Sequence, residues 1–394
     1  MKLSRTKLER YLSVIAILTI LMAWFVGGAI KEASVEPYLE QAFPTANIFN
    51  EISSGIFAAI DANGQIIGYV GIGEAKGYGG PMRLAVAVDL TGQVVGVALV
   101  DHKETPSYLR KVFQTDFVKN MLGKTYDQPF ELGKDIDGVT SATCTSAGIA
   151  NAIRQASVAI AREQLDLPAP SEPRPKIIFG LPEVSLIALF AAGYLGRKRV
   201  IRRTRLIRWG TMITGMIVLG FIYNRPLTLS KLNMFLMGYF PEWRTNLYWY
   251  LLLGGILFVL TADNRNPYCE WFCPFGAVQE CIGAIGGAKP RVRRKQQGII
   301  DWVQRGMAWL AIVIALLLRN PGVTSYEIFG TLFQLNGSVI SFAVLGIVLV
   351  GSLLSHRFWC RALCPLRPIE GFIRLIRAWI LEIWNTNVRK TRTS

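Results

Sequence analysis

The chain has 394 residues, of which 51% are hydrophobic and 18% are charged, and its formal net charge is +16. This composition is too apolar for an ordinary soluble enzyme and is typical of a membrane protein. A basic excess of this size fits either a nucleic acid or a membrane surface, and the distribution of the charge along the chain favours the membrane and no nucleic acid.

Six apolar stretches are long enough, or nearly so, to cross a bilayer, which takes about 20 residues in a helix. They cover roughly residues 12–30, 177–195, 209–223, 247–262, 300–318 and 338–354. No clean small-x-small cleavage site follows the first stretch, so we expect residues 1–30 to be a retained membrane anchor and no signal peptide. The other five predict a membrane core over residues 173–355.

Lys and Arg residues predict the orientation of these spans, because they are concentrated in cytoplasmic segments. If the N-terminus lies inside, the cytoplasmic segments hold 26 Lys and Arg residues, and the two short loops on the other side hold 4. We therefore predict a multi-pass protein of the bacterial inner (cytoplasmic) membrane, with both termini in the cytoplasm. Residues 31–172 are then extracytoplasmic (periplasmic), and residues 356–394 form a cytoplasmic tail.

The outer segment, residues 31–172, reads as an α+β domain. IIGYVGIG (66–73) and MRLAVAVDLTGQVVGVALVDH (82–102) have the alternating and β-branched residues of strands, broken by a hairpin turn at Thr91 and Gly92. Residues 106–123 and 146–165 read as helices, and a stiff Pro-rich linker (167–176) leads to the second span. The predicted fold class is a membrane protein with six transmembrane α-helices and one extracytoplasmic α+β domain.

A run of small hydroxyl residues, DGVTSATCTS (137–146), lies directly before the last of these helices. Ser and Thr are common helix N-caps, so the run can simply begin the helix. Hydroxyl groups, exposed backbone N–H groups and the positive end of a helix dipole also suit a phosphate group. The residues alone leave both interpretations open.

The segment DGVTSAT resembles the flavinylation motif Asp-x-x-Ser/Thr-Gly-Ala-Thr/Ser of the FMN-binding domains in the RnfG, NqrC and NosR families, with Ser141 in place of the usual Gly. GYGGPM (77–82) and DHKETPS (101–107) resemble the glycine loop and the His-x-Glu-Thr-Pro segment of the same domain. Ser107 replaces the customary Gly there. The matching segments follow one another in the expected order, which is more specific than one motif.

This resemblance implies an FMN joined by a phosphoester bond to Thr143 and attached by a flavin transferase. A covalent bond prevents loss of the cofactor outside the cytoplasm, where free FMN is scarce. By itself, His102 can also be a surface loop histidine. The other FMN-binding residues implied are Gly79, Gly80, His102, Glu104, Thr105, Asp137, Thr140, Ser141, Ala142, Thr145 and Ser146.

Two cysteine motifs, CEWFCP (269–274) and CRALCP (360–365), form an internal repeat with an offset of 91 residues. Each follows a predicted span, so both are expected on the cytoplasmic side, and repetition of a two-span unit brings matching elements together. Four converging thiolates could bind an iron–sulfur cluster, zinc or mononuclear iron. Structural zinc and unligated thiols are the alternatives to a redox-active iron site. The predicted metal ligands are Cys269, Cys273, Cys360 and Cys364.

The anchor, the outer FMN domain, the further spans and the twin cysteine motifs together resemble the NosR/NirI family. One difference is expected: the chain stops after a basic amphipathic stretch, GFIRLIRAWILEIW (371–384), so the C-terminal pair of ferredoxin-type clusters of the family should be absent. The two cysteine motifs also lack the Cys-x2-Cys pairs of the full ferredoxin pattern. The resemblance implies transmembrane electron transfer from quinol or a cytoplasmic, ferredoxin-like donor through the metal site to FMN. The extracytoplasmic acceptor would be nitrous oxide reductase or another respiratory protein.

A membrane redox sensor or regulator, in which FMN reports a redox state, is the alternative function. A component of an ion-pumping complex is disfavoured, because the spans hold few acidic residues that could form an ion pathway. Glu183 is the clearest of these.

Overall fold

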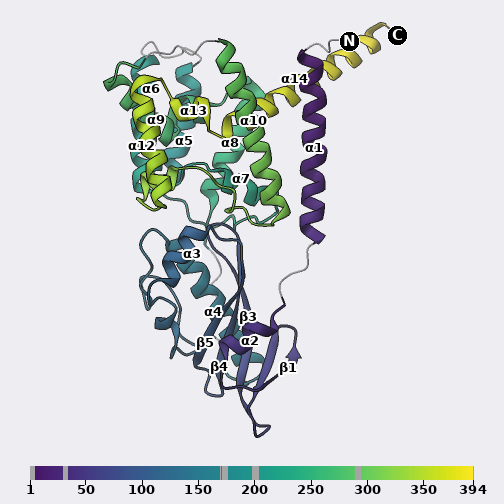
Figure 1. The fold of residues 1–394 in the computed structure, drawn as a ribbon, viewed down its shortest axis with the longest axis vertical. Coiled ribbons are helices and arrows are strands. Elements are labelled where there is room, and N and C mark those ends of the chain that lie inside the picture. The colour runs from purple at the N-terminus through teal and green to yellow at the C-terminus, as the bar shows by residue number, and fades with distance from the viewer. Residues whose placement is uncertain are drawn as a thin grey trace.

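The computed structural model of the protein describes residues 5–29, 34–168, 170, 176–197, 204–288 and 294–393. It consists of a helical part and a sheet domain, and both ends of the chain lie at the end of the helical part away from the sheet (Figure 1). Most of the predicted linker 167–176 and the basic stretch 198–203 fall outside the described residues.

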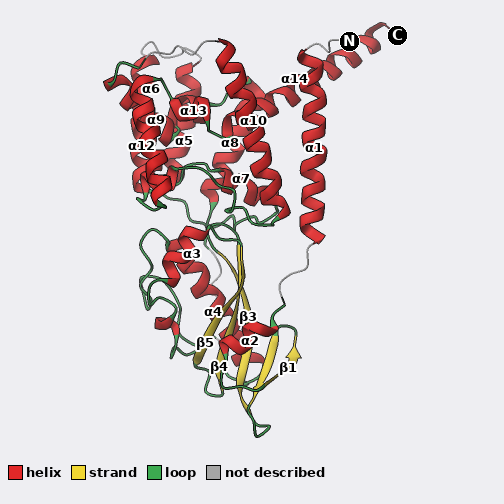
Figure 2. Ribbon diagram, in the orientation of Figure 1, coloured by secondary structure: helices red, strands yellow, loops and turns green. Residues whose placement is uncertain are grey.

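The sheet domain is built on five antiparallel strands, shown in yellow in Figure 2. Strands adjacent in the sequence are adjacent in the sheet, so short turns can connect them. The predicted hairpin turn is confirmed: Gly92 has φ 85°, a left-handed conformation that suits glycine. The strands are β1 (Ile48–Ser53), β2 (Ile56–Ile60), β3 (Ile66–Lys76), β4 (Pro81–Asp89) and β5 (Val94–His102).

Two helices cover the two faces of this sheet. The long helix α4 (Thr143–Glu163) buries Ile149 and Ile153 with Met82 in one hydrophobic core, and α2 (Glu36–Ala42) packs on the opposite face. The α+β prediction is therefore confirmed.

The helix predicted over 106–123 is only partly formed. Helix α3 (Pro106–Phe113) is followed by turns and the short 3₁₀ helix η1 (Lys119–Met121). These turns let Phe117 and Met121 reach the same core as α4, so tertiary packing overrides the local helical pattern.

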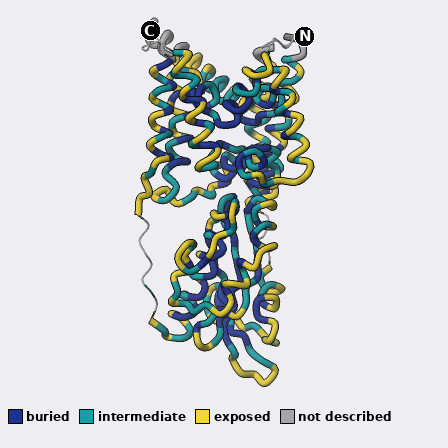
Figure 3. The backbone as a smooth tube through the Cα atoms, turned by 90° about the vertical axis from the view of Figure 1, so that its left-hand side faces the viewer, coloured by how far each residue is buried: buried dark blue, intermediate teal, exposed yellow. Residues whose placement is uncertain are grey.

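Among the described residues, the helical part contains six apolar helices that match the six predicted spans, but they differ in length. Leu8–Ala29, Thr204–Ile222 and Gln297–Leu317 are long and apolar enough to cross a membrane, and Leu181–Gly196, Leu247–Asp263 and Val339–Leu354 are shorter. The outer faces of the helical part are exposed (Figure 3), as lipid-facing surfaces would be. The protein is therefore a membrane protein, and six crossings stay a prediction.

The helices of this part range from long spans to single turns. They are α1 (Arg5–Ala29), α5 (Leu181–Arg197), α6 (Thr204–Thr214) with its π-helical continuation η2 (Gly215–Ile222), α7 (Leu229–Leu236), α8 (Leu247–Asp263), the π-helical turn η3 (Tyr268–Phe272), α9 (Pro274–Ile285), α10 (Arg294–Leu317), α11 (Phe329–Phe333), α12 (Val339–Leu354), α13 (Phe358–Ala362) and α14 (Leu366–Thr393).

Helix α9 belongs to a segment that the sequence assigns to a cytoplasmic loop, but it packs into the helical part. A Cβ atom on Gly286 would lie only 2.5 Å from the carbonyl oxygen of Leu353 on α12, so the two backbones touch. Phe275 and Ala277 are also fully or almost fully buried. This helix brings the first cysteine motif against the second one.

Candidate functional site

Thr143 is the first residue of α4, and its side chain is exposed. The N-cap residue, Ala142, has no side chain that could accept a hydrogen bond from the first N–H groups of the helix. These groups and the helix dipole are therefore available to an anion. Ser141 has φ 65°, which explains why glycine suits this position of the motif.

Glu104 ties the glycine loop to the start of α4. It is fully buried. Its Oε1 atom accepts a hydrogen bond from the Gly79 N–H group (3.0 Å), and its Oε2 atom accepts one from the Thr145 hydroxyl (3.0 Å). Burial raises the pKa of Glu104, and these hydrogen bonds and Lys231 oppose the shift.

The glycines of this loop permit close contact between the two motif segments. A Cβ atom on Gly79 would lie 2.4 Å from the carbonyl oxygen of Lys103, and one on Gly80 would lie 3.0 Å from the Lys103 side chain. Any side chain at Gly79 would therefore push the loop off the DHKETPS segment.

The other predicted flavin residues are distributed around this contact. His102 ends β5, and its Nδ1 atom is buried with no hydrogen-bond partner in the described part of the chain; burial lowers the pKa of this imidazole. Thr105 is the N-cap residue of α3. Ser146 is buried at the start of α4, whereas Asp137 and Thr140 are exposed on the preceding loop.

The flavin-site end of the sheet domain rests on the helical part. The Tyr108 hydroxyl donates a hydrogen bond to Gln334 Oε1 (2.7 Å), and the Lys76 ammonium donates one to the carbonyl oxygen of Phe240 (2.9 Å). Buried residues are concentrated where the two parts meet (Figure 3). These partners are far apart in the sequence, and no local pattern identifies them.

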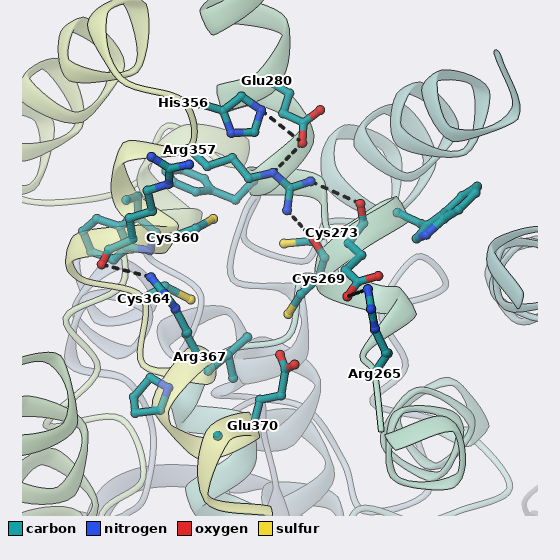
Figure 4. A pocket seen from close by; sticks show the side chains of 18 of the residues that line it. Arg265, Cys269, Cys273, Glu280, His356, Arg357, Cys360, Cys364, Arg367 and Glu370 are labelled. Carbon is teal, nitrogen blue, oxygen red and sulfur yellow. Dashed lines mark hydrogen bonds and ion pairs between the residues drawn. The ribbon is translucent and has the colours of Figure 1, made fainter. Parts of the chain in front are cut away.

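The four predicted metal ligands line one cavity of about 910 Å³. Cys269 lies in η3 and Cys273 is the N-cap residue of α9, while Cys360 lies in α13 and Cys364 follows it. Figure 4 shows the two pairs on facing sides of the cavity. A proline follows each second cysteine: Pro274 is the first residue of α9, a position that proline fits, and Pro365 directly precedes α14.

Around these cysteines, polar side chains of each repeat form hydrogen bonds with residues of the other repeat. Gln279 and Glu370 each lie ten residues after the first cysteine of their own repeat. Gln279 Nε2 donates to Cys360 Sγ (3.4 Å). Asn266 Nδ2 donates to Cys269 Sγ (3.2 Å) and to Glu370 Oε2 (3.3 Å). Each repeat thus helps to orient the first cysteine of the other.

Arg357 joins the repeats directly, although its position in the sequence carries no motif that would single it out. Its Nη1 atom donates to the carbonyl oxygen of Cys269 (2.5 Å), and its Nε atom lies 2.6 Å from Glu280 Oε1. His356 lies 3.7 Å from the same oxygen. The cavity is lined by more arginines than acids: Arg205, Arg208, Arg265, Arg305, Arg357, Arg361, Arg367 and Arg374, against Glu270, Glu280, Asp301 and Glu370.

The cysteine cavity suits an iron–sulfur cluster. Burial raises the pKa of Cys269 and Cys364 well above the ordinary thiol value, and neighbouring cysteine thiolates add to the shift. Four thiolates here therefore need metal charge to balance them. Among the described residues, no three His, Cys, Asp or Glu side chains are grouped so that they could hold a metal ion.

The segment 322–336 touches both the cysteine cavity and the sheet domain, although the sequence assigns it to an outer loop. Phe329 lines the cavity. A Cβ atom on the next residue, Gly330, would lie 3.1 Å from the Tyr108 hydroxyl, and one on Gly322 would lie 2.7 Å from Thr105 Oγ1. Two adjacent residues of α11 therefore face different sites: Phe329 lines the cavity, and Gly330 lies beside Tyr108 of the sheet domain.

Two protein families match separate parts of the chain. The FMN-binding domain matches residues 77–158, which include the glycine loop, the DHKETPS segment and Thr143. The 4Fe-4S binding domain matches residues 245–293 and 337–381, which include both cysteine motifs. The predictions of FMN and an iron–sulfur cluster are thereby confirmed. The bond to Thr143 and the individual ligands stay predictions.

The expectation that ferredoxin-type clusters are absent is wrong. Both Cys-x3-Cys-Pro segments match a 4Fe-4S binding domain together with the helices that flank them, although they lack the Cys-x2-Cys pairs of the full ferredoxin pattern.

Three relatives are similar to parts of the chain. Protein NirI of Paracoccus denitrificans is 30% identical over 213 residues, covering 47% of this chain and 30% of NirI. Regulatory protein NosR of Pseudomonas aeruginosa is 28% identical over 204 residues, covering 46% of this chain and 28% of NosR. The putative electron transport protein YccM of Escherichia coli is 27% identical over 145 residues, covering 32% of this chain and 39% of YccM.

The chain spans less than a third of NirI and of NosR and about two fifths of YccM. It carries an FMN-binding domain and a 4Fe-4S binding domain in a membrane protein, and about half of it is similar to parts of NirI and NosR.

Proposed function

We propose that the protein transfers electrons across the membrane between an iron–sulfur cluster in the cysteine cavity and an FMN covalently held at Thr143. The observation that carries this proposal is the segment 322–336, which contacts both sites. A 4Fe-4S cluster exchanges single electrons, and FMN exchanges one or two, so the pair couples two-electron and one-electron carriers.

The residues of the chain have distinct roles in this proposal. The four cavity cysteines hold the cluster, and the basic lining balances its negative charge. Thr143 holds the FMN phosphate after attachment by a flavin transferase. Aromatic rings lie on the cavity side of the proposed route: the Trp359 ring centroid lies 6.5 Å from that of Phe329 and 6.3 Å from that of Tyr326.

In the proposed orientation, the FMN domain faces the extracytoplasmic side of the bacterial inner membrane. Two observations support this orientation: Lys and Arg residues favour cytoplasmic termini, and both termini lie opposite the sheet domain (Figure 1). The electron donor is then quinol or a ferredoxin-like protein, and the acceptor is an extracytoplasmic respiratory protein. A redox sensor is the second candidate, because the NosR relative is described as a regulatory protein.

Reduction of the flavin through the cluster tests the proposal. Full-length protein carrying both cofactors is mixed anaerobically with duroquinol or with enzymatically reduced ferredoxin, and flavin absorbance is followed. We expect Cys269→Ser and Cys360→Ser to lose cluster iron and donor-driven flavin reduction while keeping a flavin-fluorescent band on a denaturing gel. Cys281→Ser is the matched control, because Cys281 lies outside the cavity lining.

Flavin reduction at the wild-type rate in both cavity variants would contradict the proposed route. Continuous turnover with ferricyanide, a membrane-impermeant acceptor, separates an electron-transfer protein from a sensor, since a sensor needs no net flux.

A further inference from the structure

Lys231 is a buried lysine of the helical part whose side chain contacts the FMN domain. It lies on α7 and is only 5% exposed. Its Nζ atom donates a hydrogen bond to the carbonyl oxygen of Tyr78 (2.6 Å), in the glycine loop. The same atom lies 4.2 Å from the Tyr78 ring centroid and 5.1 Å from that of Trp249. Lys231 thus contacts the loop that the FMN-binding family shares.

This ammonium group has no carboxylate within ion-pair distance in the described residues. A buried charge is costly unless it is paired, and aromatic rings with one carbonyl oxygen offset only part of that cost. Burial lowers the pKa of Lys231 to about 8, and the charges of Cys144 and Glu104 oppose this shift. At neutral pH the group is therefore still mostly protonated, and no carboxylate in the described part of the chain forms an ion pair with it.

The surroundings of Lys231 indicate where an anion belongs. Both Cys144 and Glu104 interact electrostatically with its ammonium group. Cys144 directly follows Thr143 at the start of α4, and Glu104 is hydrogen-bonded to the next residue, Thr145. The positive charge of Lys231 and the N–H groups at the start of α4 therefore both favour an anion beside the first residues of α4.

We propose that Lys231 is the counter-charge for the phosphodiester of FMN bound to Thr143, so that the flavin site is completed by a residue of the helical part. A phosphodiester carries one negative charge, which the ammonium group of Lys231 can balance. The inference rests on the proposed covalent FMN at Thr143, and it adds a binding residue that lies outside the matched FMN-binding domain, residues 77–158.

The test compares thermal unfolding of full-length protein with and without FMN, produced with and without coexpressed flavin transferase. In wild type, FMN attachment supplies this anion, and we expect it to raise the unfolding temperature by roughly 3 °C or more. In Lys231→Met, the FMN-free protein should be at least as stable as wild type, and the gain on attachment should largely disappear. Lys231→Gln serves the same comparison if the Met variant does not fold.

Lys76→Met is the matched control, because Lys76 also donates a hydrogen bond from one part of the protein to the other but is exposed. It should keep the full gain on FMN attachment. An equal gain in wild type and in the Lys231 variants would overturn the inference. A wild-type protein without a flavin-fluorescent band would instead refute the covalent FMN itself, so the two failures are distinguishable.

Discussion

Replacement of Glu104 tests whether the buried carboxylate organises the flavin site. Glu104→Ala would leave two buried donors, the Gly79 N–H group and the Thr145 hydroxyl, without their acceptor. Each unsatisfied donor costs about 1–3 kcal/mol, and the lost side chain leaves a cavity. We therefore expect the free energy of unfolding to fall by roughly 3–5 kcal/mol.

Glu104→Gln should be much milder. The amide oxygen can still accept from Gly79, and the amide nitrogen can donate to the Thr145 hydroxyl, which rotates to become the acceptor. We expect a loss of about 1 kcal/mol. In the double variant Glu104→Ala/Thr145→Ala the hydroxyl is absent, so its cost should be smaller than the sum of the single costs.

Urea unfolding of the full-length protein in detergent, followed by the fluorescence of the bound flavin, measures these differences. Equal destabilisation by Glu104→Ala and Glu104→Gln, within about 0.5 kcal/mol, would refute the view that Glu104 acts through its two hydrogen bonds. Additive costs in the double variant would refute the direct coupling to Thr145.

Two further predictions concern the proposed FMN attachment residue, Thr143, and a partly buried acid, Glu327. Thr143→Ala should abolish the flavin fluorescence of the denatured band, whereas Thr91→Ala, in the β4–β5 hairpin, should keep it; a fluorescent Thr143→Ala band would reject the phosphoester assignment. Burial raises the pKa of Glu327 from 4.5 to about 7, so the native state keeps a proton that the unfolded state has already released. Stability should therefore fall by roughly 1–3 kcal/mol as the pH rises from about 4.5 to about 7, and an unchanged pH slope in Glu327→Gln would contradict this assignment.

The sequence predicts best the features that depend on neighbouring residues. The Thr91–Gly92 hairpin, the helix after DGVTSAT and the twin cysteine motifs are all local patterns, and each is present in the structure. The helix predicted through Gly123 fails because burial of Phe117 and Met121 in the domain core decides that segment. Local propensity is a weak guide wherever tertiary contacts are strong.

The contacts that join the two sites could not be predicted in this way. Tyr108 and Gln334 are 226 positions apart, and Lys231 lies 153 positions from Tyr78. A charge count marks Lys231 only as one cation of an outer loop, because the count does not reveal burial. Arg357 likewise reads as one more cytoplasmic arginine, although it binds the backbone of the opposite repeat.

Both candidate cofactor sites are assembled from segments that are distant in the sequence. The cysteine cavity needs both repeats, since Gln279 of one repeat contacts Cys360 of the other. At the proposed flavin site, Lys231 of the helical part donates a hydrogen bond to the carbonyl oxygen of Tyr78 in the glycine loop. An isolated FMN domain would keep Thr143 and Glu104 but would lack this ammonium group. The charge environment of the flavin therefore depends on how the FMN domain docks against the helical part. The same docking places Tyr108 beside Gly330, and the neighbouring residue Phe329 lines the cysteine cavity.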